Sequence, residues 1–239
     1  MNKQQTITHT QKRFDELVQF LKTKPGVRAI FIHGSIARGE IDEWSDIDVL
    51  VVTLRKTSFI RYVDGRLDME VDAVCLDQVE ERLRREPAIC YAWSNLQAVY
   101  DPENLGATIS ATVKQCVREY ETPKLFLADT YIRLRHLRQK CARGTFDTVV
   151  QSALTFTVAQ ELIAAEFGLR NRILPPAMII VPMYFQQTFS SPAMKTIIRS
   201  AVKGTKRSQL FVSTIDHMLA RLAPVMRNFP QYYRNWNSR

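Results

Sequence analysis

The chain has 239 residues and a net charge of +9 at neutral pH, and 46% of its residues are apolar and 24% charged. This length allows one large domain or two small ones, and the composition is that of a globular protein, which excludes a disordered chain. No apolar run reaches the ~20 residues of a membrane-spanning helix, and the N-terminus lacks the apolar stretch of a secretory signal. The four cysteines form no Cys-x-x-Cys pair, which argues against zinc and against a disulfide framework. We therefore expect a soluble cytoplasmic protein that makes no membrane contact.

The charge is distributed unevenly along the chain. Residues 1–105 contain 14 basic and 17 acidic residues, a net charge of −3, whereas residues 106–239 contain 19 and 7, a net charge of +12. An acidic part suits divalent cations, and a strongly basic part suits phosphates, nucleic acid or another anionic partner. We predict a domain boundary after residue 105, just behind the turn Tyr100-Asp-Pro.

The predicted elements change from mixed to helical at this boundary. The first is an amphipathic helix over residues 9–23, which Lys24-Pro-Gly ends. Three apolar runs rich in β-branched residues predict strands at 27–33, 47–53 and 69–76, and a helix follows them up to Pro87. Later helices are predicted at 107–120, 123–144, 145–168 and 208–229, with shorter pieces after Pro175-Pro176. The predicted fold class is α/β (α+β), with a sheet domain over 1–105 and an all-helical domain over 106–239.

One predicted strand begins with two carboxylates. Asp46 and Asp48 are two residues apart, so both side chains project from the same face of the strand. Adjacent like charges repel each other, and the strand has no structural use for them. A divalent cation removes this conflict, and Mg²⁺ prefers carboxylate oxygens while leaving room for substrate phosphate.

Gly34 and Ser35 lie where the preceding strand ends and a short helix begins. Backbone N–H groups and the helix dipole at such a junction attract phosphate, glycine allows close approach, and the serine hydroxyl adds a donor. Arg38 follows one turn later and either contacts phosphate or pairs with a surface acid. The sequence thus predicts a phosphate site close to the acidic pair.

A third carboxylate should come from a neighbouring strand. Asp72 is the best candidate, and Glu70, on the same face of that strand, is the reserve choice. Three carboxylates can hold two metal ions ~3.5–4 Å apart, one for the nucleophile and one for the leaving group.

These residues resemble the signature of the DNA polymerase β-like nucleotidyltransferase superfamily. Gly34-Ser35, then Asp46-x-Asp48 among apolar residues, then an apolar-flanked Asp72 follow its order, and the resemblance covers about residues 27–76. The form Gly-Ser-x-Ala-x-Gly…Ser-Asp-Ile-Asp-Val-Leu-Val is similar to its small bacterial branch, which includes the minimal enzymes and the antibiotic nucleotidyltransferases for kanamycin and lincosamides.

The resemblance implies a nucleotidyltransferase domain at 1–105, with a mixed sheet flanked by helices. It also implies Mg²⁺ on Asp46, Asp48 and Asp72 as catalytic residues, and a nucleoside triphosphate on Gly34 and Ser35, to which Arg38 is added as a candidate from its position one turn later. The implied reaction transfers a nucleoside monophosphate, AMP from ATP by family habit, to a hydroxyl of a small-molecule acceptor and releases pyrophosphate.

Other functions stay open on the sequence. The chain could be a non-catalytic nucleotide-binding or antitoxin-type interaction protein, or it could transfer to RNA or protein; nucleic acid is the less favoured acceptor because no RNA-binding module is present. The oligomeric state is open. His33 is a candidate for core packing or catalysis, and Glu161 or Glu166 could serve as a general base in the helical domain.

Overall fold

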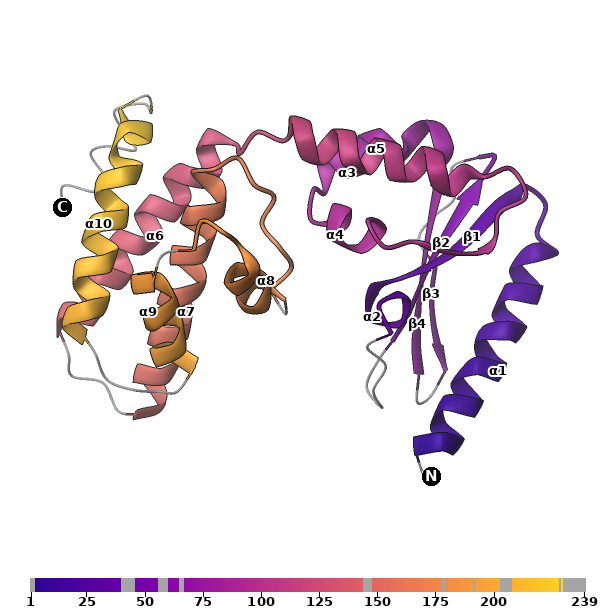
Figure 1. The fold of residues 1–239 in the computed structure, drawn as a ribbon, viewed down its shortest axis with the longest axis horizontal. Helices are drawn as coiled ribbons and strands as arrows, with labels where there is room; N and C mark the ends of the chain where they lie inside the picture. The colour runs from indigo at the N-terminus through magenta and orange to yellow at the C-terminus, as the bar shows by residue number, and fades with distance from the viewer. Residues whose placement is uncertain are drawn as a thin grey trace. The chain divides into compact units, whose positions relative to one another are not determined.

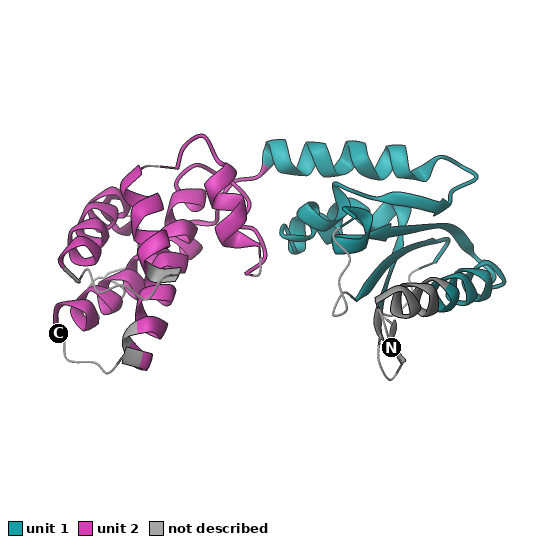
Figure 2. Cartoon of the chain, turned by 60° about the horizontal axis from the view of Figure 1, so that its bottom comes forward, with its two compact units in different colours: residues 1–119 teal, residues 120–239 magenta. Residues whose placement is uncertain are grey.

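The computed structural model describes residues 3–39, 46–55, 60–64, 67–143, 148–177, 179–190, 192–202, 208–227 and 229. The chain divides into two compact units, residues 1–119 and residues 120–239 (Figure 2). The first contains a mixed sheet with flanking helices and the second is helical, so the predicted fold class is confirmed. No helix among the described residues is both long and apolar enough to cross a bilayer.

The first unit is built on a five-stranded sheet with the order β3-β4-β2-β1-β5. Only β2 and β4 run parallel, and all other neighbours are antiparallel. The strands are β1 (Val27–His33), β2 (Ile47–Thr53), β3 (Ile60–Asp64), β4 (Leu67–Cys75) and β5 (Gln97–Tyr100). The sequence predicted β1 and β2 with these bounds and β4 within two residues, whereas the two edge strands β3 and β5 were missed.

One face of the sheet packs against α1 (Lys3–Lys22), which Figure 1 shows alongside the strands. Val18 and Leu21 of α1 are buried with apolar side chains from β1, β2 and β4. On β2 this face consists of Ile47, Val49 and Val51, all almost fully buried. Alternate residues along a strand point to opposite faces, so Asp48 and Leu50 belong to the other face.

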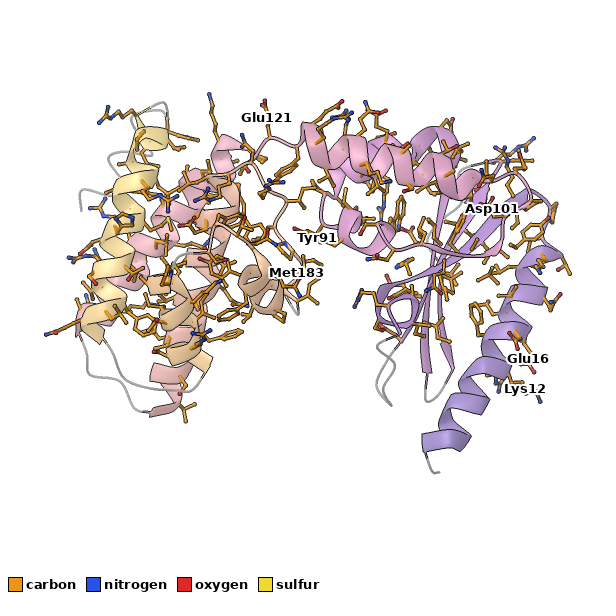
Figure 3. The ribbon with its side chains drawn as sticks, in the orientation of Figure 1. Lys12, Glu16, Tyr91, Asp101, Glu121 and Met183 are labelled. Carbon is orange, nitrogen blue, oxygen red and sulfur yellow. The ribbon has the colours of Figure 1, made fainter. Side chains whose placement is uncertain are left out.

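Three helices pack together on the other side: α3 (Val79–Arg85), α4 (Ile89–Trp93) and α5 (Leu105–Glu119). Asp101, labelled in Figure 3, caps the first turn of α5: its carboxylate accepts hydrogen bonds from the backbone N–H groups of Leu105 at 2.7 Å and Gly106 at 2.9 Å. Gly106 then lies against Phe31 of β1: a Cβ there would be 2.9 Å from the ring. The start of α5 is thereby held directly on the sheet.

The position of α5 moves the boundary between the compact units. The change in charge predicted a boundary after residue 105, but the first unit ends at Glu119. Ile109 and Val113 of α5 are buried, and Arg84 of α3 donates to the Glu119 carboxylate at 2.8 Å. This helix therefore belongs to the sheet unit, although its composition resembles that of the helices after it.

The second unit contains five helices in its described residues, with one apolar core among them. They are α6 (Lys124–Arg143), α7 (Thr148–Gly168), α8 (Ile180–Gln186), α9 (Pro192–Val202) and α10 (Ser208–Met226). The helices α6, α7 and α10 pack side by side (Figure 1). Buried residues such as Leu134, Leu162 and Ile215 recur at helical spacing along them.

One charged side chain lies within this helical core. Glu166 of α7 is only 4% exposed and accepts hydrogen bonds from Arg221 of α10 and from Arg170 one turn later on α7. The Arg170 guanidinium also lies 4.8 Å from the centroid of the Phe189 ring. A buried carboxylate costs free energy unless it is paired, so these arginines are needed to keep Glu166 inside.

We predict that Glu166→Ala lowers the free energy of unfolding by roughly 2–3 kcal/mol, because it leaves the half-buried Arg221 and the exposed Arg170 without their acceptor. Asp216→Ala is the matched control, since it removes an exposed carboxylate that pairs with Arg138. Exposed pairs contribute under about 1 kcal/mol. Urea unfolding followed by circular dichroism measures the free energy of unfolding of both variants. An equal loss of this free energy in Glu166→Ala and Asp216→Ala would contradict the assigned role of Glu166.

Candidate active site on the sheet

Three strands bring polar side chains to one face of the sheet, opposite α1. In the register of the sheet, Asp48 of β2 lies between His33 of β1 and Glu70 of β4. Residues directly opposite each other on neighbouring strands share a face, so the three form a row across the sheet. Asp46 precedes Asp48 by two residues, and Asp72 lies opposite Leu50, one step further along β4.

The Asp48 carboxylate rests against the backbone of Gly34. Gly34 has a φ of +70°, and a Cβ at this position would be only 2.1 Å from Oδ2 of Asp48 and 3.1 Å from its Cγ. A side chain would therefore collide with the carboxylate and would also strain the left-handed backbone. The turn into α2 (Gly34–Ala37) and the acidic pair of β2 are in direct contact at this point.

Asp48 lies in an electrostatically unfavourable position. Its pKa is raised to about 6, mainly by burial and also by the neighbouring charges of Asp46 and Glu70, while Arg38 acts in the opposite direction. Asp46 is exposed, and Asp48 and Glu70 are half-buried. A positive charge placed among these carboxylates would relieve both their repulsion and the cost of burying Asp48.

Asp72 has a different environment from Asp48. Its Oδ2 lies 3.6 Å from Nη2 of Arg82 on α3, and the same guanidinium donates to Glu86 at 2.8 Å. Burial raises the pKa of Asp72, Arg82 lowers it and Glu86 raises it. Asp72 therefore already has a cationic partner from the helix layer, whereas the residues that act on the Asp48 pKa are mostly anionic.

His33 stays neutral at physiological pH, because burial lowers its pKa to about 4. Its Nδ1 atom is buried and makes no hydrogen bond within the described part of the chain. Ser35 lies in the same turn as Gly34, and its carbonyl oxygen accepts the backbone N–H of Arg38 at 3.1 Å. The arginine itself is exposed and follows the last residue of α2.

The donor set of this face suits a hard divalent cation, although the side chains do not surround one point. Over the described residues, no group of three or more His, Cys, Asp or Glu side chains has a geometry that could hold a metal ion. Carboxylate oxygens gathered on one face are nevertheless the kind of ligand that Mg²⁺ prefers. The fit is therefore one of chemistry and charge, with Asp46, Asp48 and Glu70 as the neighbouring carboxylates.

The helical candidates are occupied in ion pairs. Glu161 accepts a hydrogen bond from Nε of Arg133 at 2.8 Å, and its Oε2 is buried without a hydrogen-bond partner among the described residues. Glu166 is held by Arg221 and Arg170 as described above. Both carboxylates have a structural use inside the second unit.

A comparison with known protein families identifies the domain that contains this face of the sheet. Residues 14–99 match the family model described as a nucleotidyltransferase domain. Residues 14–99 form a nucleotidyltransferase domain. This range includes all five strands apart from the last residue of β5, and it includes Gly34, Asp46, Asp48, Glu70 and Asp72. The nucleotidyltransferase domain supports nucleotidyl transfer as the general activity and a transferase as the class of enzyme.

Solved structures add a general likeness. A nucleotidyltransferase-like protein from Exiguobacterium sibiricum 255-15 is 13% identical with a TM-score of 0.44, over 85% of this chain and 72% of that chain. The spectinomycin adenyltransferase AAD(9) from Enterococcus faecialis, solved with ATP and spectinomycin, is 12% identical with a TM-score of 0.36, over 93% of this chain and 100% of that chain. These TM-scores are low, so neither likeness assigns a residue or a substrate to this chain. Among curated proteins, the sequence has no significant match.

The pKa of Asp48 predicts an unusual pH dependence of stability. Because its folded pKa of about 6 lies above the usual value of ~3.9, its favourable contribution is complete below about pH 4 and is lost as the pH rises through 6. We therefore expect Asp48→Asn to raise the melting temperature in EDTA at pH 7.5, by roughly 2–6 °C, and to give no gain at pH 4.

Glu103→Gln is the control of opposite sign within the same unit. A hydrogen bond from Arg28 lowers the pKa of Glu103, so its contribution is present at neutral pH and lost on acidification. This variant should be slightly less stable than wild type at pH 7.5. An Asp48→Asn protein that melts below wild type in EDTA at pH 7.5 would refute the strained position of Asp48.

Proposed function

We propose that the protein is a Mg²⁺-dependent nucleotidyltransferase that transfers a nucleoside monophosphate, AMP from ATP, to a hydroxyl of a small-molecule acceptor. The observation that carries the proposal is the contact of the Asp48 carboxylate with Gly34 in a nucleotidyltransferase domain. It joins the residues proposed for the triphosphate to those proposed for the metal. One face of the sheet then has proposed binding positions for both the metal and the triphosphate.

In the proposed reaction the acceptor oxygen attacks the α-phosphorus of the triphosphate. A P–O bond to the acceptor forms, the bond between the α-phosphorus and the bridging oxygen breaks, and pyrophosphate leaves with that oxygen. The acceptor hydroxyl loses its proton to a base. Bound Mg²⁺ would supply Lewis-acid stabilisation of the phosphoryl oxygens and lower the pKa of the attacking hydroxyl.

The residues of this face have different proposed roles, which follow from their charges. Asp46 and Asp48 are proposed to hold Mg²⁺, since they flank Ile47, the first residue of β2, and the charges of Asp46 and Glu70 raise the pKa of Asp48 while only Arg38 among the described residues that act on it lowers it. The backbone at Gly34 and Ser35 is proposed to bind the triphosphate. Arg38 adds a positive charge near the same carboxylate, in reach of a phosphate drawn to the site.

The third carboxylate is proposed to come from β4, and the register favours Glu70. The sequence pattern pointed first to Asp72, with Glu70 in reserve. Glu70 lies directly across from Asp48 and acts on its pKa, whereas Asp72 lies one step further and has Arg82 as its partner. A cation near Asp72 would have to compete with that guanidinium.

We predict that Asp46→Asn, Asp48→Asn and Glu70→Gln each lower transfer by more than about a hundredfold, because they remove charge that the metal needs. Asp72→Asn should lower the rate of transfer by less than about tenfold. Pyrophosphate release from ATP, GTP, CTP and UTP with Mg²⁺ measures the rate, with kanamycin, streptomycin and lincomycin among the acceptors.

A second readout does not depend on knowing the acceptor. Mg²⁺ with ATP should raise the melting temperature of the wild type, since a ligand that binds only the folded state stabilises it, whereas ATP with EDTA should not. Asp216→Asn, an exposed acid of α10, serves as the control and should behave as wild type. Equal shifts with Mg²⁺ and with EDTA would count against the metal, and a Mg²⁺-dependent shift without pyrophosphate release would favour a protein that only binds nucleotide.

A further inference from the structure

A cavity lies in the sheet unit, on the face opposite the acidic row. Its volume is about 470 Å³, within the ~300–1,000 Å³ of small-molecule sites. Its floor is formed by Val51 and Thr53 of β2 with Val71 and Ala73 of β4, which point toward the α1 side of the sheet. The remaining lining residues are Leu21, Lys24, Pro25, Gly26, Val27, Leu54 and Arg55. None of the residues proposed for nucleotidyl transfer lines this cavity.

The cavity exists because short side chains meet a helix that ends early. α1 ends at Lys22, and the turn that follows reaches β1 through Gly26, whose φ is +88°. The floor residues are valine, threonine and alanine, so little volume projects from the sheet. The backbone N–H of Leu54 donates to the carbonyl of Gly26 at 2.8 Å, which fixes the turn to the end of β2. This part of the rim is therefore held in place by the backbone.

Two cations and the exposed side chain of Leu54 line the cavity, and Phe20 contacts one of these cations. Lys24 and Arg55 line the cavity and are both exposed, and no ion pair involves either of them in the described part of the chain. Leu54 is 66% exposed, and Phe20, whose ring centroid lies 3.8 Å from Nζ of Lys24, is 55% exposed. The hydroxyl of Thr53 donates to the carbonyl oxygen of Arg55 at 2.6 Å and so fixes the arginine backbone at the edge.

We propose that this cavity binds an organic anion with an apolar body and a single negatively charged group. The apolar floor favours hydrocarbon or an aromatic ring, because burying apolar surface is favourable and burying an unpaired polar group is not. Among the described residues no acidic side chain lines the cavity, and Lys24 and Arg55 offer two positive charges at its mouth. A neutral apolar molecule would leave these charges unused, and a nucleoside triphosphate would place too much charge against an apolar floor. The ligand is therefore distinct from the nucleotide of the proposed reaction.

Dodecanoate is a suitable probe, and isothermal titration calorimetry below its micelle concentration measures its binding. We expect wild-type protein to bind it with a Kd in the micromolar range and to bind dodecan-1-ol at least tenfold more weakly. The double variant Lys24→Gln/Arg55→Gln changes only exposed side chains and should weaken dodecanoate at least tenfold. Lys114→Gln/Arg118→Gln removes two exposed cations of α5 and should bind as wild type within twofold.

Two further arms test the place of binding. Ala73→Phe fills the cavity and should abolish binding of both probes, and if this variant does not fold, the exposed double variant decides. Saturating ATP with Mg²⁺ should leave the dodecanoate Kd unchanged, because the two sites share no residue. The proposal is overturned if wild-type protein binds no dodecanoate up to 1 mM, if it binds the alcohol equally well, or if Lys24→Gln/Arg55→Gln binds as tightly as wild type.

Discussion

The contact between Gly34 and the Asp48 carboxylate is the constraint on which the candidate site depends. It brings the turn after β1 onto the first residues of β2, in a space that a Cβ would occupy. Because the same carboxylate is half-buried beside Asp46 and Glu70, its ionised form is disfavoured in the empty protein. A cation and a phosphate would complete the charge balance at this point.

The central strand β2 serves two purposes with its two faces. Ile47, Val49 and Val51 form the core with α1, and this burial keeps the strand in the middle of the sheet. The alternate residues place Asp48 at one end of the opposite face and Leu50 under the helix layer. A shift of register by one residue would bury the carboxylate against α1 and expose the apolar set, so the core also determines the direction of the acid. Stability and the proposed chemistry are coupled through this alternation.

Local patterns were enough to predict β1, β2 and the acidic pair, because each rests on a few consecutive residues. The edge strands were missed: Gln97 and Ala98 of β5 are exposed and show no alternation of buried and exposed positions. Which residue of β4 lies opposite Asp48 depends on the parallel pairing of β2 and β4, a contact between distant segments that spacing alone does not determine. The pairing of Arg82 with Asp72 depends in the same way on how α3 packs. The sequence did not predict that α5 packs on the sheet unit, because this packing depends on the contact between Gly106 and Phe31, two residues that lie far apart in sequence.

The most direct test of the metal and nucleotide site is a crystal structure with Mn²⁺ and a non-hydrolysable ATP analogue. Mn²⁺ replaces Mg²⁺ at oxygen sites and gives an anomalous signal that locates it without interpretation of weak density. The account predicts an anomalous peak bound by Asp46 and Asp48 with Glu70 as the β4 ligand, and the triphosphate against the backbone of Gly34 and Ser35. A Mn²⁺–nucleotide complex bound elsewhere on the protein, with these carboxylates free of metal, would contradict it.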